Sequence, residues 1–139
     1  MMFRFSILIC ILSLLACNSD QTTIGTDDKG REDFNDFHTA FYADSVFQIQ
    51  RIEFPMMGYE TDGSNASKLW DFDNWKFLQE VDDSVEGIEY LPFFDMGDLV
   101  RTRLMIQKKF MIECYFSLKE NKWYMTGYSG MHDLDFFRK

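Results

Sequence analysis

Residues 99–128 read LVRTRLMIQKKFMIECYFSLKENKWYMTGY, and this stretch decides the fold. It contains three runs in which apolar and polar side chains alternate, as they do along strands that bury one face. Short polar segments at 107–109 and 119–122 separate the runs, and connections this short form tight turns between antiparallel strands. The pattern predicts three consecutive antiparallel strands, over 99–106, 110–118 and 123–128.

The two faces of the predicted middle strand differ in character. One face carries apolar side chains around Cys114, which we interpret as a buried, inert thiol. The opposite face carries Glu113 and Tyr115, and Tyr124 lies on the next strand. These three residues could line a cavity, but the same alternation is typical of the outer, wet face of a sheet, so both interpretations stay open.

Residues 32–43 precede the strands and predict an amphipathic helix. Phe34, Phe37, His38 and Phe41 fall at i, i+3, i+4 and i+7, which places them on one stripe. We expect His38 to pack within that stripe rather than to act chemically. A helix at the start and a meander at the end give the α+β class, with the helix covering one face of an antiparallel sheet.

The middle of the chain predicts less regular structure. Asp44-Ser45 can cap a short second helix over 46–48, and residues 50–54 look extended up to a proline. We expect polar loops over 58–67 and 81–87. The segment between these loops is expected to pack through its aromatic side chains, which are Trp70, Phe72 and Trp75.

The first seventeen residues have the pattern of a bacterial lipoprotein signal. Arg4 precedes an apolar run over 5–16, which is too short to span a bilayer because spanning takes about twenty residues. The ending Leu14-Leu15-Ala16-Cys17 resembles the lipobox. That resemblance implies signal cleavage between Ala16 and Cys17, with a diacylglycerol group on the Cys17 sulfur.

An acylated Cys17 would anchor the protein in a membrane, since each buried methylene contributes about 0.8 kcal/mol. Asn18 is not the Asp that favours retention in the inner membrane. We therefore expect an outer-membrane position in the bacterial cell envelope, with the periplasmic and the surface face both open. Residues 1–16 would be the signal peptide, 17–30 the lipidated cysteine with a flexible tether, and 31–139 one α+β domain.

The composition disfavours nucleic acid as a partner. Without residues 1–16, whose one charged side chain is Arg4, the chain has 13 basic and 23 acidic residues and a net charge of −10. Such a chain repels phosphate backbones. After processing and acylation Cys114 would be the one free thiol, so no disulfide within the chain is expected.

A family resemblance rests on the motif Phe47-Gln48-x-x-Arg51-Ile52-x-Phe54-Pro55, together with the phenylalanine-rich helix before it and the later Trp75-Lys76-Phe77 and Trp123. These residues resemble a group of Bacteroidetes envelope lipoproteins, the domain of unknown function 4348, over about residues 33–128. The resemblance implies a cone similar to nuclear transport factor two and ketosteroid isomerase, in which a curved antiparallel sheet wraps around helices and a cavity. It implies no activity.

These observations favour a non-enzymatic, lipid-anchored envelope domain that binds a small apolar ligand or serves an envelope complex as an accessory part. No cofactor is expected. The alternative is a small cavity enzyme of the isomerase, dehydratase or hydrolase type, which would need a carboxylate base beside a hydroxyl or protonated carboxyl group. An apolar cavity would favour the first function, and a buried carboxylate next to a tyrosine would favour the second.

The sequence also predicts roles for several individual residues. Arg51 could bind a ligand carboxylate in the cavity with Glu113, Tyr115 and Tyr124. Its alternative role is a structural ion pair with an Asp of the first helix or of the acidic loops. Ser84 and Ser45 each follow an Asp and precede a valine, a pattern that Bacteroidetes envelope proteins O-glycosylate. No metal site is expected. Asp71-x-Asp73-Asn74 begins like a calcium loop but lacks the glycine and the closing glutamate that such a loop needs.

Overall fold

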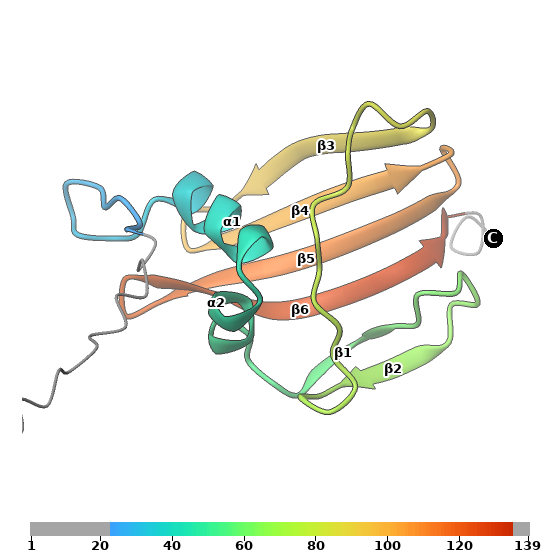
Figure 1. The fold of residues 1–139 in the computed structure, drawn as a ribbon, viewed down its shortest axis with the longest axis horizontal. Coiled ribbons are helices and arrows are strands. Elements are labelled where there is room, and N and C mark those ends of the chain that lie inside the picture. Colours follow the sequence, from blue (N-terminus) through green and yellow to red (C-terminus); the bar gives the residue numbers. More distant parts are fainter. Residues whose placement is uncertain (1–22, 135–139) are drawn as a thin grey trace, which may run out of the picture.

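The computed structural model describes residues 23–134. Its centre is a four-stranded antiparallel sheet in the order β3-β4-β5-β6 (Figure 1). The strands span Ile88–Asp95, Leu99–Ile106, Phe110–Lys119 and Lys122–Asp133. The predicted meander is confirmed, and the last strand is longer than expected. The sequence analysis missed β3, the edge strand, in which Pro92 coincides with a break in register between Leu91 and Phe94.

The turns of the meander explain why consecutive strands pair. Glu120 and Asn121 form the two-residue turn between β5 and β6, and both have positive φ, at 49° and 65°. Gln107 and Lys108, between β4 and β5, are also left-handed, at 52° and 54°. Two successive left-handed residues give a turn whose twist matches that of the flanking strands.

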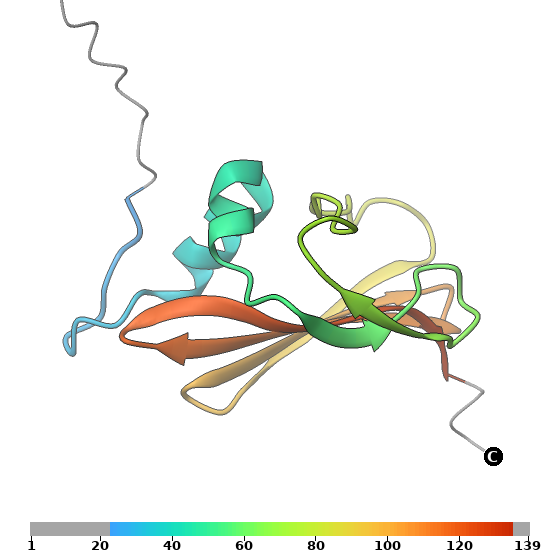
Figure 2. The same ribbon diagram turned by 90° about the horizontal axis from the view of Figure 1, so that it is seen from below.

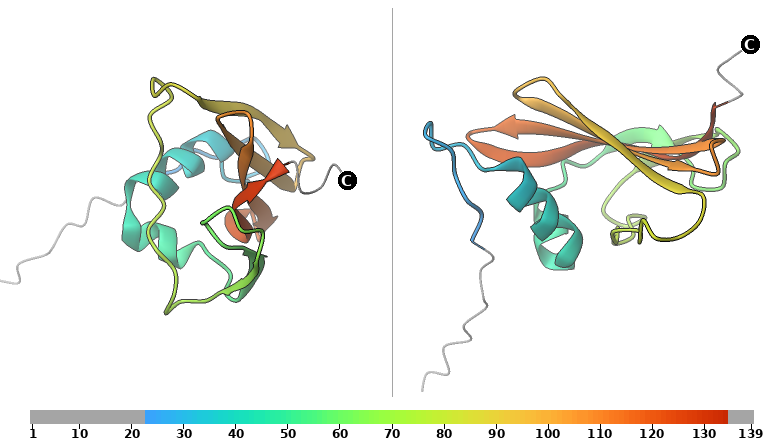
Figure 3. Two further views of the ribbon diagram at one scale, coloured as in Figure 1. Left: turned by 90° about the vertical axis from the view of Figure 1, so that its right-hand side faces the viewer. Right: turned by 90° about the horizontal axis from the view of Figure 1, so that it is seen from above.

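Two helices precede the sheet in the chain, α1 over Phe34–Ala43 and α2 over Ser45–Gln50. Each begins at an aspartate that caps it. The Asp33 carboxylate accepts a hydrogen bond from the Asp36 backbone, and the Asp44 carboxylate accepts from Val46 and Phe47. These caps satisfy amide groups that have no partner inside the helix. Figures 2 and 3 show both helices, and the long segment that leads to β3, on the same side of the sheet.

A small hairpin, β1 over Met56–Tyr59 and β2 over Ser67–Trp70, lies next to β6 (Figure 1). The hairpin comes so close that a Cβ atom at Gly58 would sit 1.7 Å from the Tyr128 carbonyl oxygen, and one at Gly130 would sit 2.6 Å from the Tyr59 oxygen. Only glycine permits this approach. The ends of the loop expected over 58–67 belong to β1 and β2, so the loop itself spans 60–66.

The core lies between α1 and the concave face of the sheet. Phe37, Phe41, Phe116 and Met125 are fully buried, and Phe116 makes edge-on contacts with all three phenylalanines of α1. The helical stripe and the apolar face of the middle strand are thus confirmed. Phe72, in the turn after β2, packs less than expected. It is 67% exposed, and its ring meets the half-buried Phe54 edge-on at a centroid distance of 6.5 Å.

Residues before 31 also contribute to the fold. Ile24 packs against the core, the Gly25 amide donates to the Asp36 carboxylate, and Thr26 bridges Glu32. Residues 24–26 therefore contact the folded domain, within the segment 17–30 that the sequence predicted as a tether. Cys17, Ala16 and the rest of the signal lie outside the described residues. Within residues 23–134, no helix is long and apolar enough to cross a bilayer.

Candidate ligand-binding cavity

A cavity of about 100 Å³ lies between α1, the concave face of the sheet and the segment 78–81. The helix contributes His38 and Tyr42 to its wall. Most of the wall is apolar and comes from alternate residues of neighbouring strands, so the strand periodicity itself builds the cavity. The strand residues that line it are Tyr90, Thr102, Arg103, Leu104, Ile112, Cys114 and Tyr128.

The polar groups of the wall bond to one another. The Tyr42 hydroxyl donates to the Cys114 sulfur at 3.6 Å, and Thr102 hydrogen-bonds to the same sulfur. Burial raises the pKa of the Cys114 thiol to about 11 and raises the pKa values of Tyr42 and Tyr128 well above their usual range. All three groups are therefore neutral near pH 7. This confirms that Cys114 is buried, and its raised pKa makes it unreactive.

His38 stands between aromatic rings at the edge of the cavity. Its ring centroid lies 4.8 Å from that of Tyr42, 5.2 Å from that of Phe93 and 5.6 Å from that of Phe34. Burial among these rings lowers the pKa of His38 to about 4, so the imidazole is neutral near pH 7. The packing role expected for His38 agrees with these contacts.

A strap without regular structure, residues 78–81, covers one side of the cavity and is fixed at both ends. At one end the buried Gln48 side chain donates to the Leu78 carbonyl and accepts from the Leu78 amide, each at 2.9 Å. At the other end the Tyr90 hydroxyl accepts from the Val81 amide at 2.9 Å and donates to the Val81 carbonyl at 3.0 Å. Both attachments use side chains to replace the strand partner that the strap lacks.

The structure places Glu113 and Tyr115 on the other face of the sheet, away from this cavity. The Tyr115 hydroxyl donates to the Glu113 carboxylate at 3.3 Å, and Arg101 lies 3.5 Å from that carboxylate. His132 lies 3.9 Å from it. Of the two interpretations that the sequence left open, these contacts agree with the outer face of the sheet and not with a place in the cavity wall. In the strand alternation, Cys114 and Phe116 occupy the inner face, which leaves Glu113 and Tyr115 outside.

Arg51 and Tyr124 also lie apart from the cavity, near the opposite end of α1. The Arg51 guanidinium donates to both Glu32 carboxylate oxygens, at 2.6 and 3.1 Å, and its central carbon lies 5.3 Å from the Tyr124 ring centroid. The Glu32 carboxylate also accepts from the Trp123 amide at 2.9 Å. Arg51 thus forms a structural ion pair, the alternative to ligand binding, but its partner is Glu32 just before α1 and not an Asp of the helix or of the acidic loops.

The remaining predicted residues lie on the surface. Ser45 is the first residue of α2 and Ser84 lies in the loop after the strap, and both are exposed. Asp71 accepts hydrogen bonds from the amides of Asp73 and Asn74, so this motif is a side-chain-stabilised turn. Within residues 23–134, no group of His, Cys, Asp and Glu side chains could hold a metal ion.

Sequence reasoning missed Tyr42, Thr102 and Tyr90 as wall residues. Two signals were available for the first two. Tyr42 is four residues after His38 and so lies one helical turn further along the same face. Thr102 shares the inner strand face with Val100 and Leu104. Tyr90 carried no such signal, because its strand was itself missed.

Two solved structures resemble this fold. A protein from Bacteroides uniformis, solved by NMR, aligns with a TM-score of 0.55 and 18% identity over 76% of this chain and 79% of its own. A crystal structure of a nuclear transport factor two-like protein from Bacteroides fragilis aligns with a TM-score of 0.52 and 20% identity, over 78% of this chain. The present chain covers only 50% of that second protein.

The fold is therefore the nuclear transport factor two-like α+β cone, as the sequence suggested. No protein-family model matches the chain, and no curated protein matches it. Membership in the domain of unknown function 4348 stays a prediction. At such low identity the likeness concerns the fold alone, and the same fold carries many functions.

Proposed function

We propose that this protein is a lipid-anchored domain of the bacterial cell envelope that binds a small, mainly apolar molecule in the cavity beside α1. One observation carries the proposal: the cavity has an apolar wall whose tyrosine, cysteine and histidine side chains are all neutral near pH 7. Arg103 is the one charged residue among the described residues that line the cavity, and its guanidinium donates to the Pro92 carbonyl at 3.3 Å at an exposed position. The rest of the wall favours an uncharged ligand, because burying an unpaired charge there would be costly.

The volume of the cavity limits the size of the ligand. At about 100 Å³ it is smaller than the 300–1,000 Å³ that is usual for a drug-sized ligand. It is comparable with a cavity of about 150 Å³ that accepts benzene. We therefore expect a single small ring or a short branched chain. The Tyr42 hydroxyl is the group best placed to bond a polar atom on such a ligand.

The alternative function, a cavity enzyme of the isomerase type, has weaker support. Its base would be a carboxylate beside a hydroxyl group. Among the described residues that form this cavity there is no Asp or Glu. Glu113 and Tyr115 do form such a pair, but they lie on the other face of the sheet.

Binding can be tested with toluene as the probe, a single ring of the expected size, by following the amide resonances of the cavity wall in ¹⁵N-labelled protein. Val81 belongs to the cavity wall and Val85, in the same loop, does not. We expect Val81→Trp to weaken probe binding about tenfold, which is about 1.4 kcal/mol, and Val85→Trp to leave it unchanged. Equal affinities for the two variants, or no binding by the parent protein, would refute a ligand role for this cavity.

The membrane anchor is tested separately. We expect the intact mass of the mature protein from its native host to show acyl groups on Cys17, and the protein to fractionate with the outer membrane. Cys17→Ser should release it from the membrane fraction. An unacylated Cys17 would refute the anchor without bearing on the cavity. The same mass spectra would show whether Ser84 or Ser45 carries a glycan.

A further inference from the structure

A second hollow, of about 190 Å³, lies between the β1–β2 hairpin and the segment 74–78. It shares Leu78 and Tyr128 with the first cavity but differs in character. Its wall combines an ion pair, formed by Glu60 and Lys68, with several aromatic rings. Neither the fold nor the proposed binding of an apolar ligand accounts for this combination.

The aromatic part of the wall is a rigid cluster. The rings of Trp70, Trp75 and Tyr128 meet edge to face, with centroids 5.2 to 5.8 Å apart. The Trp75 indole N–H also donates to the Gln48 side chain at 3.2 Å, which fixes the orientation of that ring. Trp75 is only half-buried, so part of it remains available to a ligand. A ring held in place loses little entropy when a ligand stacks on it.

The ion pair supplies both kinds of hydrogen-bonding group. The Lys68 ammonium donates to both Glu60 oxygens, at 2.9 and 3.1 Å, and lies 4.6 Å from the Trp70 ring centroid. An ammonium group has three donors and a carboxylate about four acceptor positions, so each partner keeps unused capacity. The side chains are 25% and 35% exposed, which leaves them open to a ligand.

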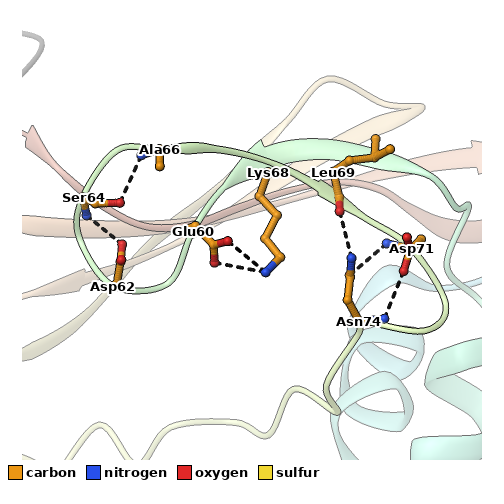
Figure 4. A network of polar contacts seen from close by, with 8 residues as sticks. All are labelled: Glu60, Asp62, Ser64, Ala66, Lys68, Leu69, Asp71 and Asn74. Carbon is orange, nitrogen blue, oxygen red and sulfur yellow. Dashed lines mark hydrogen bonds and ion pairs between the residues drawn. The ribbon is translucent and has the colours of Figure 1, made fainter.

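The polypeptide around this hollow is held in shape by local hydrogen bonds (Figure 4). Asn74 accepts from the Asp71 amide and donates to the Leu69 carbonyl, each at 3.0 Å. In the hairpin turn, the Asp62 carboxylate accepts from the Ser64 amide at 2.9 Å. Glu60 and Lys68 therefore project from a frame that is already ordered, as a preformed site requires.

We propose that this hollow binds a neutral, polyhydroxylated ring, that is, one unit of a saccharide. Neighbouring hydroxyl groups can donate to Glu60 while accepting from Lys68, and the C–H face of the ring can stack on Trp75. The Glu60 carboxylate would repel an anion. Besides Lys68, the described residues of the wall include one cation, Lys76. A neutral ligand keeps the Glu60–Lys68 pair intact, so no buried charge is left unpaired.

The test titrates ¹⁵N-labelled protein with the methyl glycosides of glucose, galactose, mannose and N-acetylglucosamine. The Trp75 indole N–H resonance is the reporter. We expect at least one glycoside to shift it in a saturable way, and Glu60→Gln to weaken that binding about tenfold. Glu53→Gln is the matched control, because Glu53 pairs with Lys119 at 40% exposure elsewhere on the surface. It should leave binding unchanged.

Three outcomes would overturn the proposal. The first is that no glycoside shifts the Trp75 resonance up to its solubility limit. The second is that Glu60→Gln and Glu53→Gln have equal effects. The third is that phosphate or glycine binds more tightly than any glycoside, which would identify a site for an anion or a zwitterion. None of these outcomes affects binding of toluene in the first cavity, so the two proposals can fail separately.

Discussion

Gln48 and Leu78 are joined by two hydrogen bonds of 2.9 Å, one in each direction between the glutamine amide and the leucine backbone. The Gln48 side chain is thereby a substitute for a strand that would otherwise pair with the strap. It also donates to the Phe41 carbonyl at 2.9 Å and accepts from the Trp75 indole. One buried side chain thus connects both helices, the strap of the first cavity and the aromatic wall of the second hollow.

We expect Gln48→Ala to lower the free energy of unfolding by about 3 kcal/mol, because it leaves several shielded backbone groups without partners. Urea denaturation followed by tryptophan fluorescence would measure the change. Gln50→Ala is the control in the same helix, and since Gln50 is exposed it should stay within about 0.5 kcal/mol of the parent. A cost below 1 kcal/mol for Gln48→Ala would contradict the anchoring role.

The ion pair of Arg51 and Glu32 predicts a second large effect. The two side chains are only 13% and 10% exposed. Removing one partner leaves the other charge shielded and unpaired, so we expect Arg51→Met to cost about 3 kcal/mol. Lys119→Met removes the cation of an exposed pair and should cost less than about 1 kcal/mol. Equal costs in denaturation experiments would show that Arg51 stabilises by packing alone.

Much of the fold could be predicted because local patterns agree with tertiary structure. The helix from Phe34 carries a regular apolar stripe, and the strand from Phe110 alternates cleanly, so each periodicity identified its element. The strand over Ile88–Asp95 has no such alternation, since it lies at the sheet edge and contains Pro92. The hairpin of β1 and β2 depends on the fit of Gly58 against β6, a long-range contact that composition does not reveal.

The candidate site was harder to predict for a related reason. Alternation placed Glu113 and Cys114 on opposite faces of a strand and predicted that the Cys114 face is buried, but it did not show that this face also lines a cavity. The candidate residues Glu113 and Tyr115 lie on the outer face of the sheet. The inner face, which lines the cavity, carries Thr102 and Cys114. The strap could not be assigned at all, because it is held by the side chains of Gln48 and Tyr90 rather than by its own sequence pattern.

His38 predicts a specific dependence of stability on pH. Its pKa is lowered from 6.5 to about 4 in the folded protein. Between these values the unfolded chain binds the proton and the folded protein does not, so stability falls as the pH drops from 6.5 to 4. The contribution is about 2–3 kcal/mol over that range. His38→Gln should flatten this part of the curve of unfolding free energy against pH. An unchanged slope would contradict burial of a neutral His38.

Cys114 predicts a strongly suppressed reactivity. Its pKa of about 11 leaves a thiolate fraction at pH 8 that is a few hundredfold below that of an ordinary cysteine, and the side chain is also buried. We therefore expect Ellman's reagent to modify a protein with both Cys10→Ser and Cys17→Ser, whose one thiol is Cys114, at least about a hundredfold more slowly in buffer than in urea. Met57→Cys in the same background is the control for an exposed thiol, since Met57 is 69% exposed, and it should react at once. Similar rates at both positions would mean that the cavity wall opens readily, and that the apolar site is not preformed.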